Sequence, residues 1–242
     1  MNKPVLGVLG GVGPMATAAF MEAVISRTPA QCDQDNIPMI VFNDPQIPDR
    51  TAFILDPSEP DPLPEMVKVA RWLEDAGADY IAIPCNTAHY FHDAIAAAVE
   101  VPVLNIMELT ARRVAALAGP GARVGLMATE GTTQSGVFQG YFEQAGLETV
   151  VPSEEERAIV TSLIYDTVKR NRPFDPDVML GVAERLRGQG CDAVVLGCTE
   201  LSVIYATLDD APTWLVDAMD VLADACVEAY ERTRAKAGPV EM

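Results

Sequence analysis

Short, continuous runs of aliphatic and β-branched residues recur along the chain, and they predict β-strands. The predicted strands are Val5–Leu9, Met39–Phe42, Tyr80–Ile83, Val101–Asn105, Arg123–Met127, Glu148–Val151, Ala193–Leu196 and Trp214–Val216. Because these runs are continuously apolar rather than alternating, each strand is expected to be buried on both faces of its sheet.

Segments with helical spacing of their apolar positions lie between most of the predicted strands. The predicted helices include Pro64–Ala76, Thr87–Val99, Leu109–Leu117, Glu154–Lys169 and Val178–Arg187. Strand and helix therefore alternate, which is typical of βαβ units with parallel strands. The predicted fold class is α/β.

The two halves of the chain resemble each other. Residues 77–85 read GADYIAIPC and residues 190–198 read GCDAVVLGC, and the two segments align without a gap. This repeat predicts two similar, pseudosymmetric α/β domains, each with a mainly four-stranded parallel sheet flanked by helices. Since ligands of open parallel sheets bind at the carboxyl ends of the strands, the active site is expected in the cleft between the two domains.

The repeat also predicts where the domains begin and end. The first domain covers residues 1–106 and the second covers residues 107–208. The C-terminal segment 209–242 contains a helix over about Ala218–Arg234, which is expected to pack back on the first domain.

The composition narrows the class of protein. With 49% hydrophobic and 21% charged residues the chain can bury a large core, which excludes intrinsic disorder. The formal net charge is −18. Nucleic acids and anionic membrane surfaces are therefore not expected as partners, because binding phosphate groups requires clustered Lys and Arg.

The cysteine pattern predicts a cytoplasmic protein. Five cysteines without a C-x-x-C pair do not form a disulfide framework. Lys3 and the apolar run 5–9 imitate a signal peptide, but glycine and proline within residues 10–14 interrupt it and predict strand, loop and helix instead. No run of about 18 apolar residues occurs, so no membrane span is expected.

Cys85 and Cys198 each end a predicted strand, and a helix is predicted after each of them. A thiol at a helix N-terminus faces unpaired backbone N–H groups and the positive end of the macrodipole, which stabilise its thiolate. Asn86, Thr87 and Thr199, which follow the cysteines, suit a helix cap or an oxyanion. One such cysteine could be an inert buried residue, but two at equivalent positions indicate a function.

The spacing Cys85-x-x-x-His89-x-x-His92 does not predict a metal site, because no fourth ligand accompanies it. His89, one helical turn after Cys85, could instead help to polarise the site. His92 is expected at the surface.

Two loops and one lysine have weaker chemical signals. The glycine-rich loop at residues 7–14 lacks the spacing of a nucleotide-binding loop and is predicted to bring backbone N–H groups to a substrate carboxylate. Arg50 lies in a proline-rich segment that is predicted to be a long loop, where it could bind a carboxylate. Lys169, near a predicted helix end, has a routine explanation in the macrodipole.

Five segments together resemble the aspartate/glutamate racemase family. They are GGVGPMAT at residues 10–17, DRT at 49–51, PCNTAH at 84–89, ATEGT at 128–132 and GCTEL at 197–201. Gly10, Gly11 and Glu200 stand where the family's glutamate racemases have Asp-Ser-Gly and a histidine, so the chain is more similar to the aspartate racemase branch. The resemblance implies an isomerase, often dimeric, that needs no pyridoxal phosphate, metal or nucleotide.

The resemblance also implies roles for individual residues. Cys85 and Cys198 are the catalytic pair, one taking a proton from the α-carbon of an amino acid and the other supplying one to the opposite face. Arg50 and Lys169 would hold the distal carboxylate of a dicarboxylic substrate. The residues expected to bind substrate are Gly11, Met15, Arg50, Asn86, Thr87, His89, Thr129, Thr132, Lys169, Thr199 and Glu200.

Two alternatives remain open from the sequence. One is a maleate isomerase-like enzyme, or another isomerase or decarboxylase of small dicarboxylates, in which a single cysteine attacks carbon as a nucleophile. The other is a protein that binds a ligand in the same cleft without catalysis. The presence of both Cys85 and Cys198 argues against the protein that only binds, and a covalent adduct would favour the small-dicarboxylate isomerase.

Overall fold

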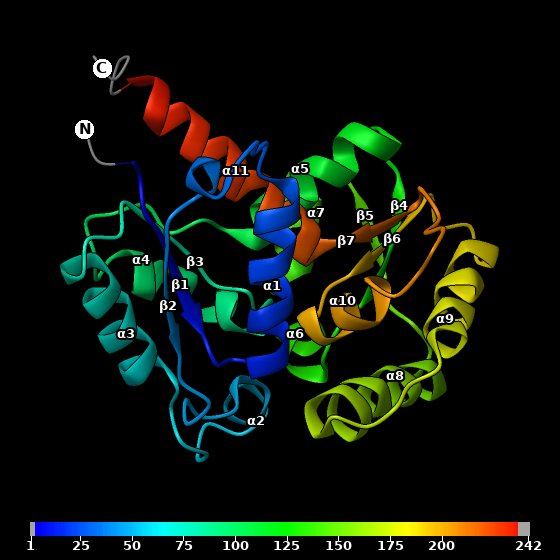
Figure 1. Cartoon of the computed structure of the whole chain (residues 1–242). Helices are drawn as coiled ribbons and strands as arrows, with labels where there is room; N and C mark the ends of the chain where they lie inside the picture. Colours follow the sequence, from blue (N-terminus) through cyan, green and yellow to red (C-terminus); the bar gives the residue numbers. More distant parts are fainter. Residues whose placement is uncertain (1–2, 237–242) are drawn as a thin grey trace.

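The chain forms two parallel β-sheets, with helices between them and on their outer faces (Figure 1). This arrangement is seen in a computed structural model, which describes residues 3–236. Residues 1–2 and 237–242, at the two ends of the predicted domain ranges, lie outside the described residues. The α/β fold predicted from the alternation of strand and helix is confirmed.

The first sheet has three strands in the order β2-β1-β3. They are β1 (Leu6–Gly10), β2 (Met39–Asn43) and β3 (Tyr80–Ala82), all parallel. β1 is buried along its whole length, whereas β2 lies at the edge and is partly exposed. The continuous apolar run therefore predicted double-sided burial correctly for the central strand.

A fourth strand in the first sheet was expected at residues 101–105, and that prediction is wrong in extent. Only Val103 pairs, as a single parallel bridge with Ile81. Pro102 has no N–H to donate to a ladder, and Asn105 already caps the next helix by accepting hydrogen bonds from two backbone N–H groups. Too few residues remain between them for a strand.

The second sheet has four parallel strands in the order β5-β4-β6-β7. They are β4 (Arg123–Met127), β5 (Glu148–Val150), β6 (Ala193–Leu196) and β7 (Leu215–Asp217). β5, β4 and β6 take the places that β2, β1 and β3 take in the first sheet, and β7 takes the place of the bridge at Val103. The two halves therefore have the same strand order.

The repeated Gly-x-Asp motif performs the same task in both sheets. Asp79 accepts a hydrogen bond from the backbone N–H of Val5 at 2.7 Å, and Asp192 accepts one from Arg123 at 2.9 Å. Each carboxylate thus binds the backbone at the start of the sheet's central strand. This shared contact gives a structural reason for the internal repeat.

Helices connect the strands and follow the predicted pattern where that pattern was regular. They are α1 (Pro14–Arg27), α2 (Arg50–Leu55), α3 (Leu63–Asp75), α4 (His92–Ala96), α5 (Ile106–Ala118), α6 (Glu130–Ser135), α7 (Val137–Gln144), α8 (Glu154–Thr161), α9 (Pro176–Gly188), α10 (Thr199–Tyr205) and α11 (Ala218–Lys236). Two predicted long helices are broken. The segment 87–99 is a 3₁₀ turn followed by α4, and the segment 154–169 is α8 followed by a π-helical turn over Ser162–Thr167.

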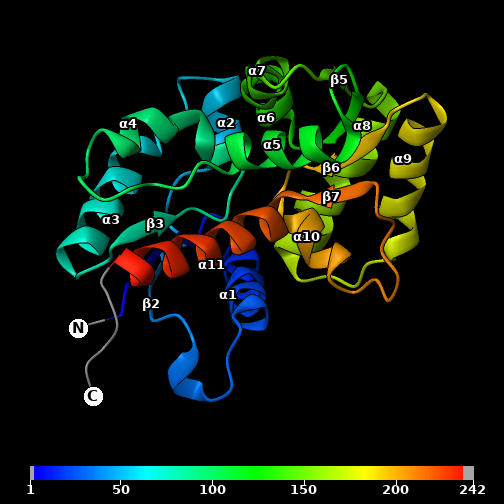
Figure 2. The ribbon, with the colours of Figure 1, turned by 90° about the horizontal axis from the view of Figure 1, so that it is seen from above.

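A layer of helices packs between the two sheets and joins them through one apolar core. Phe20 of α1, Ile106 of α5 and Leu222 of α11 are fully buried in the same cluster as Val8 of β1 and Val195 of β6. Figure 2 shows α11 running from β7, in the second sheet, along α1 and α5. The division of the chain into domains at residues 106 and 208 stays a prediction.

A search of the helices over residues 3–236 finds none that is long and apolar enough to span a membrane.

Asp217, which ends β7, is expected to make the stability of the fold depend on pH. It is buried, caps α11 and accepts a hydrogen bond from Ser202, and burial followed by the nearby charge of Asp220 raises its pKa from 3.8 to about 7. The folded protein then binds this proton more tightly than the unfolded chain. The resulting contribution to the free energy of unfolding is full below about pH 4 and is lost as the pH rises toward 7, on the order of 4 kcal/mol.

Urea unfolding of the wild type and of Asp217→Asn between pH 4 and pH 8 measures this contribution. The variant should lose less stability across that range than the wild type. Glu184→Gln, which changes an exposed carboxylate of α9, is the control and should follow the wild type. Parallel curves for wild type and Asp217→Asn would contradict the assignment.

Candidate active site

Cys85 and Cys198 come from equivalent positions of the two halves and line the same small chamber, called the inner chamber below. Their side chains are buried, at 6% and 4% exposure. Cys198 is the N-cap residue of α10, as the sequence predicted. Cys85 precedes a 3₁₀ turn instead of the predicted α-helix, so fewer aligned peptide dipoles face it. The inner chamber has a volume of about 10 Å³, which is room for about one water molecule.

On one side of the inner chamber, the thiol of Cys198 is hydrogen-bonded to a carboxylate. Its Sγ donates a hydrogen bond to Oε2 of Glu200 at 3.0 Å, and Oε1 of Glu200 lies 3.2 Å from Nζ of Lys169. Burial, together with the charge of Glu200, raises the pKa of Cys198 well above its ordinary value, and Lys169 offsets only part of this rise. Cys198 therefore rests as the protonated thiol.

Lys169 stays charged in this arrangement. It lies in a 3₁₀ turn over Val168–Arg170, directly after the π-helical turn. Burial alone would lower the pKa of Lys169, but the charges of Glu200 and Cys198 outweigh it and raise the pKa above its ordinary value. Lys169 therefore keeps its positive charge opposite Glu200, and both residues line the inner chamber.

On the other side, Arg50 places a fixed positive charge beside Cys85. It opens α2, so the prediction of a long loop is wrong at this point; Asp49 caps this helix by accepting a hydrogen bond from Ala52 N at 2.9 Å. Arg50 is 6% exposed, and its Nη1 donates to the carbonyl oxygens of Ile47 and Pro48. Burial opposes its charge, but the charges of Cys85 and Asp49 outweigh burial and raise the pKa of Arg50.

Four threonine hydroxyls form a cluster that joins the two halves at the floor of the site. Thr87 Oγ1 lies 3.0 Å from Thr129 Oγ1 and 2.9 Å from Thr132 Oγ1, and Thr129 also bonds Thr132 at 3.1 Å and Thr51 at 3.2 Å. Thr51, Thr87 and Thr129 line the inner chamber. Thr132, fully buried, lies behind them. The cluster can donate or accept hydrogen bonds, as the binding of a carboxylate requires.

Asn86 and Thr199, the residues that follow the two cysteines, are buried with unpaired polar atoms. The amide nitrogen and oxygen of Asn86 and the hydroxyl oxygen of Thr199 have no hydrogen-bond partner within the described residues. A buried polar group without a partner costs roughly 1–3 kcal/mol, so such atoms are typical of sites that bind a further molecule. Neither residue is among those that line the inner chamber, so their role in binding substrate stays a prediction.

His89 lies behind the site rather than in it. Its Nδ1 lies 2.9 Å from the carbonyl oxygen of Cys85 and its Nε2 lies 3.3 Å from that of Leu104. Burial lowers the pKa of His89 to about 4, so the ring is neutral at neutral pH. His92, expected at the surface, is instead mostly buried and stacks on His89. Over residues 3–236 no group of three or more His, Cys, Asp or Glu side chains is arranged to hold a metal ion.

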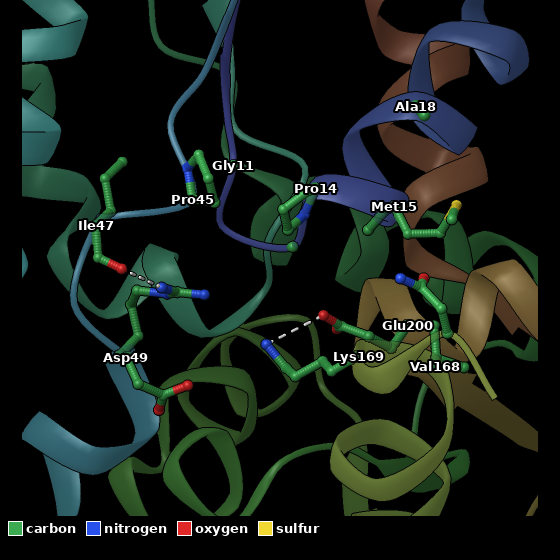
Figure 3. A pocket seen from close by; sticks show the side chains of 14 residues that line it. Gly11, Pro14, Met15, Ala18, Pro45, Ile47, Asp49, Val168, Lys169 and Glu200 are labelled. Carbon is green, nitrogen blue, oxygen red and sulfur yellow. Dashed lines mark hydrogen bonds and ion pairs between the residues drawn. The ribbon is translucent and has the colours of Figure 1, made fainter.

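The loop between β1 and α1 opens the site toward a larger space, called the outer cavity below, of about 530 Å³. Gly11 and Met15 line it, as do Arg50, Lys169 and Glu200 (Figure 3). A Cβ at Gly11 would come within 2.2 Å of the backbone of Asp44. The loop can therefore pass this point only as glycine.

Four residues that line the inner chamber were not predicted as site residues: Val12, Asp49, Thr51 and Tyr165. Thr51 was noticed only as part of the Asp-Arg-Thr segment, although its hydroxyl belongs to the threonine cluster. Tyr165 lies under Lys169, whose Nζ is 5.1 Å from the ring centre, and its hydroxyl donates to Asp49 at 3.4 Å. The sequence contained one signal for Tyr165: it precedes Lys169 by about one helical turn, which places the two side chains on the same side of a helix.

Comparison with known proteins identifies the family. The chain matches the Asp/Glu/Hydantoin racemase family over residues 9–226. The chain belongs to this family. The relatives that match this chain are amino-acid racemases, which are isomerases. The resemblance to this family that five sequence segments indicated is confirmed.

The chain aligns with nearly the whole length of two relatives and with about half the length of a third. The chain is 28% identical to the broad specificity amino-acid racemase RacX of Bacillus subtilis, over 93% of this chain and 97% of that one. It is 30% identical to the aspartate racemase of Picrophilus torridus, whose structure matches with a TM-score of 0.81 over 94% of both chains. With the glutamate racemase of Corynebacterium kroppenstedtii it shares 32% identity over 63% of this chain and 54% of that protein.

Proposed function

We propose that the protein racemises amino acids, aspartate or glutamate among them, by moving protons between two cysteines and the α-carbon. The observation that carries this proposal is the position of Cys85 and Cys198, which reach one inner chamber from equivalent strand ends of the two halves. Inversion of a carbon centre requires a base on one face and an acid on the other. A pseudosymmetric pair of thiols supplies both.

The surroundings of the two thiols differ. Burial and the charge of Glu200 raise the pKa of Cys198, so it holds its proton, while the positive charge of Arg50 lies toward Cys85. In one direction the Cys85 thiolate takes the α-proton, the C–H electron pair remains on the substrate as a carbanion, and the thiol of Cys198 donates its proton to the opposite face. The reverse direction starts from the Cys85 thiol and the Cys198 thiolate.

The remaining groups bind the substrate in this proposal. The threonine cluster, Asn86 and Thr199 hold the α-carboxylate and the ammonium group. Arg50 and Lys169 hold the distal carboxylate of an acidic substrate, with Lys169 leaving Glu200 to do so. The homodimer and the cytoplasmic location expected from the sequence belong to the same proposal, and they rest on the resemblance and on the composition.

Incubation with a panel of L-amino acids in deuterated water tests the proposed chemistry. We expect racemisation together with one deuteron at Cα for each inverted molecule, without added cofactor. A Cys85→Ala/Cys198→Ala double variant is the matched control and should give neither. Absence of Cα deuteration with every amino acid would contradict the proposal and favour a protein that only binds its ligand.

A second incubation, with maleate in place of the amino acids, addresses the small-dicarboxylate isomerase, which no observation on this chain favours. In that enzyme a cysteine would bond covalently to a carbon of the substrate. Intact-mass measurement during turnover should therefore find the unmodified protein if Cys85 and Cys198 act only as acid and base. A mass increase equal to a dicarboxylate such as maleate would favour the alternative.

A further inference from the structure

The outer cavity is far larger than the side chain of aspartate needs. It has a volume of about 530 Å³, within the range of pockets that hold a whole small molecule, whereas the inner chamber has about 10 Å³. Asp49, Arg50, Lys169 and Glu200 line both spaces. A substrate whose α-carbon lies between the thiols therefore extends its side chain past these four residues into the outer cavity.

The charges at this passage cancel. Arg50 and Lys169 contribute two positive charges, and Asp49 and Glu200 contribute two negative ones. Lys169 is already paired with Glu200 at 3.2 Å, and Nη1 of Arg50 already donates hydrogen bonds to two backbone carbonyl oxygens, while the buried Nε of Arg50 has no partner within the described residues. A distal carboxylate would have to compete with Glu200 for Lys169 and would face the charge of Asp49. An uncharged side chain has no such cost.

Beyond the passage most of the lining residues are apolar, and Asn171 is the polar one among them. Figure 3 shows Pro14 and Met15 on the α1 side of the cavity, with Ile47 and Pro45 on the opposite side. Met15 is 47% exposed, and Ala18 lies one helical turn further along α1. Methionine is flexible and polarizable, so it adapts to partners of different shape. Such walls suit a long, flexible hydrocarbon or thioether chain.

We infer that the preferred substrates are amino acids with long, uncharged, flexible side chains, of the methionine and leucine kind, rather than dicarboxylic amino acids. This inference rests on the proposed two-cysteine racemisation and specifies its substrate class. The side chain lies along Met15 and Ala18 of α1. With these uncharged substrates the ion pair between Lys169 and Glu200 stays closed during turnover, whereas an acidic substrate has to open it.

Initial rates of racemisation for L-methionine, L-leucine, L-alanine, L-aspartate and L-glutamate test the inference. We expect kcat/KM for methionine to equal or exceed that for aspartate and to exceed that for alanine by about tenfold, since burying one or two more carbon groups is worth roughly that much. A higher kcat/KM for aspartate than for methionine would overturn the inference and leave the racemase proposal standing. Lack of Cα deuteration with all five would remove the racemase proposal itself.

Ala18→Leu provides a second, independent measurement, because it fills the wall of the outer cavity without touching the inner chamber. It should lower the ratio of kcat/KM for methionine to that for alanine by about tenfold. Glu22→Leu is the matched control: it adds the same side chain one helical turn further along the exposed face of α1, outside the cavity. An unchanged ratio in Ala18→Leu, or an equal fall in Glu22→Leu, would overturn the inference.

Discussion

Cys85→Ser and Cys198→Ser are both expected to lose racemisation by about 10³-fold or more, and to retain opposite half-reactions. Either direction of inversion needs both thiols, so neither variant can invert the α-carbon. A serine hydroxyl gives up its proton far less readily than a thiol, so the substituted side contributes little. Each variant still has one thiol, which can take the α-proton from the enantiomer that presents it and return a deuteron to the same face.

The measurement is Cα deuteration of pure L- and pure D-amino acid by each variant in deuterated water. One variant should slowly deuterate only the L-form, and the other only the D-form, without inversion. The result also assigns each cysteine to one enantiomer. Cys191→Ser, at a buried cysteine outside the inner chamber, is the control and should retain racemisation.

Two outcomes would contradict the two-base assignment. In the first, both variants deuterate the same enantiomer, which would mean that the two thiols reach the same face of the α-carbon. In the second, either variant racemises at the wild-type rate, which would make its cysteine dispensable. Circular dichroism should match the wild type in both variants, so that lost activity is not mistaken for lost folding.

The central strands of both sheets could be predicted because their burial is recorded in local sequence. A strand covered on both faces must be apolar at every position, as in β1 and β6. The strand predicted at residues 101–105 had the same kind of pattern. It was shortened by Pro102 and by the cap at Asn105, and the balance between those residues and strand pairing depends on the neighbouring chain.

The two thiols could be located from sequence because the repeat placed them at equivalent strand ends. The partners of Cys198 could not be located in the same way. Glu200 is two residues away, but Lys169 approaches it from a 3₁₀ turn that follows a π-helical turn, and a regular helical pattern does not predict this change of path. His89 shows the opposite error: one helical turn from Cys85 in sequence, it bonds the backbone behind the site. Sequence spacing gives neighbours, whereas the direction of each side chain depends on local backbone geometry.

Glu200→Gln is expected to lower kcat/KM by about 10²-fold, equally in both directions, and to shift the alkaline limb of its pH profile to lower pH. In the wild type, burial and the charge of Glu200 hold the pKa of Cys198 high, so Cys198 remains a proton donor. Glutamine removes that charge and leaves Lys169 facing the thiol alone, which favours the thiolate.

The shape of the loss separates a positioning role of Glu200 from a merely structural one. Racemisation has equal amounts of both enantiomers at equilibrium, so kcat/KM must fall by the same factor for the L- and the D-substrate. The ionisation of Cys198 therefore changes the pH profile and leaves the ratio of kcat/KM for the L- and the D-substrate unchanged.

Titration of thiolate absorbance in Glu200→Gln should show one thiol ionising at lower pH than in the wild type. Glu22→Gln, at an exposed glutamate of α1, should leave both the titration curve and the pH profile unchanged. The carboxylate of Glu200 fits beside Cys198 because residue 13 is glycine: a Cβ at Gly13 would come within 2.6 Å of Oε1 of Glu200. An alkaline limb of Glu200→Gln that coincides with that of the wild type would mean that Glu200 does not hold the pKa of Cys198 high. Burial alone would then keep the Cys198 thiol protonated.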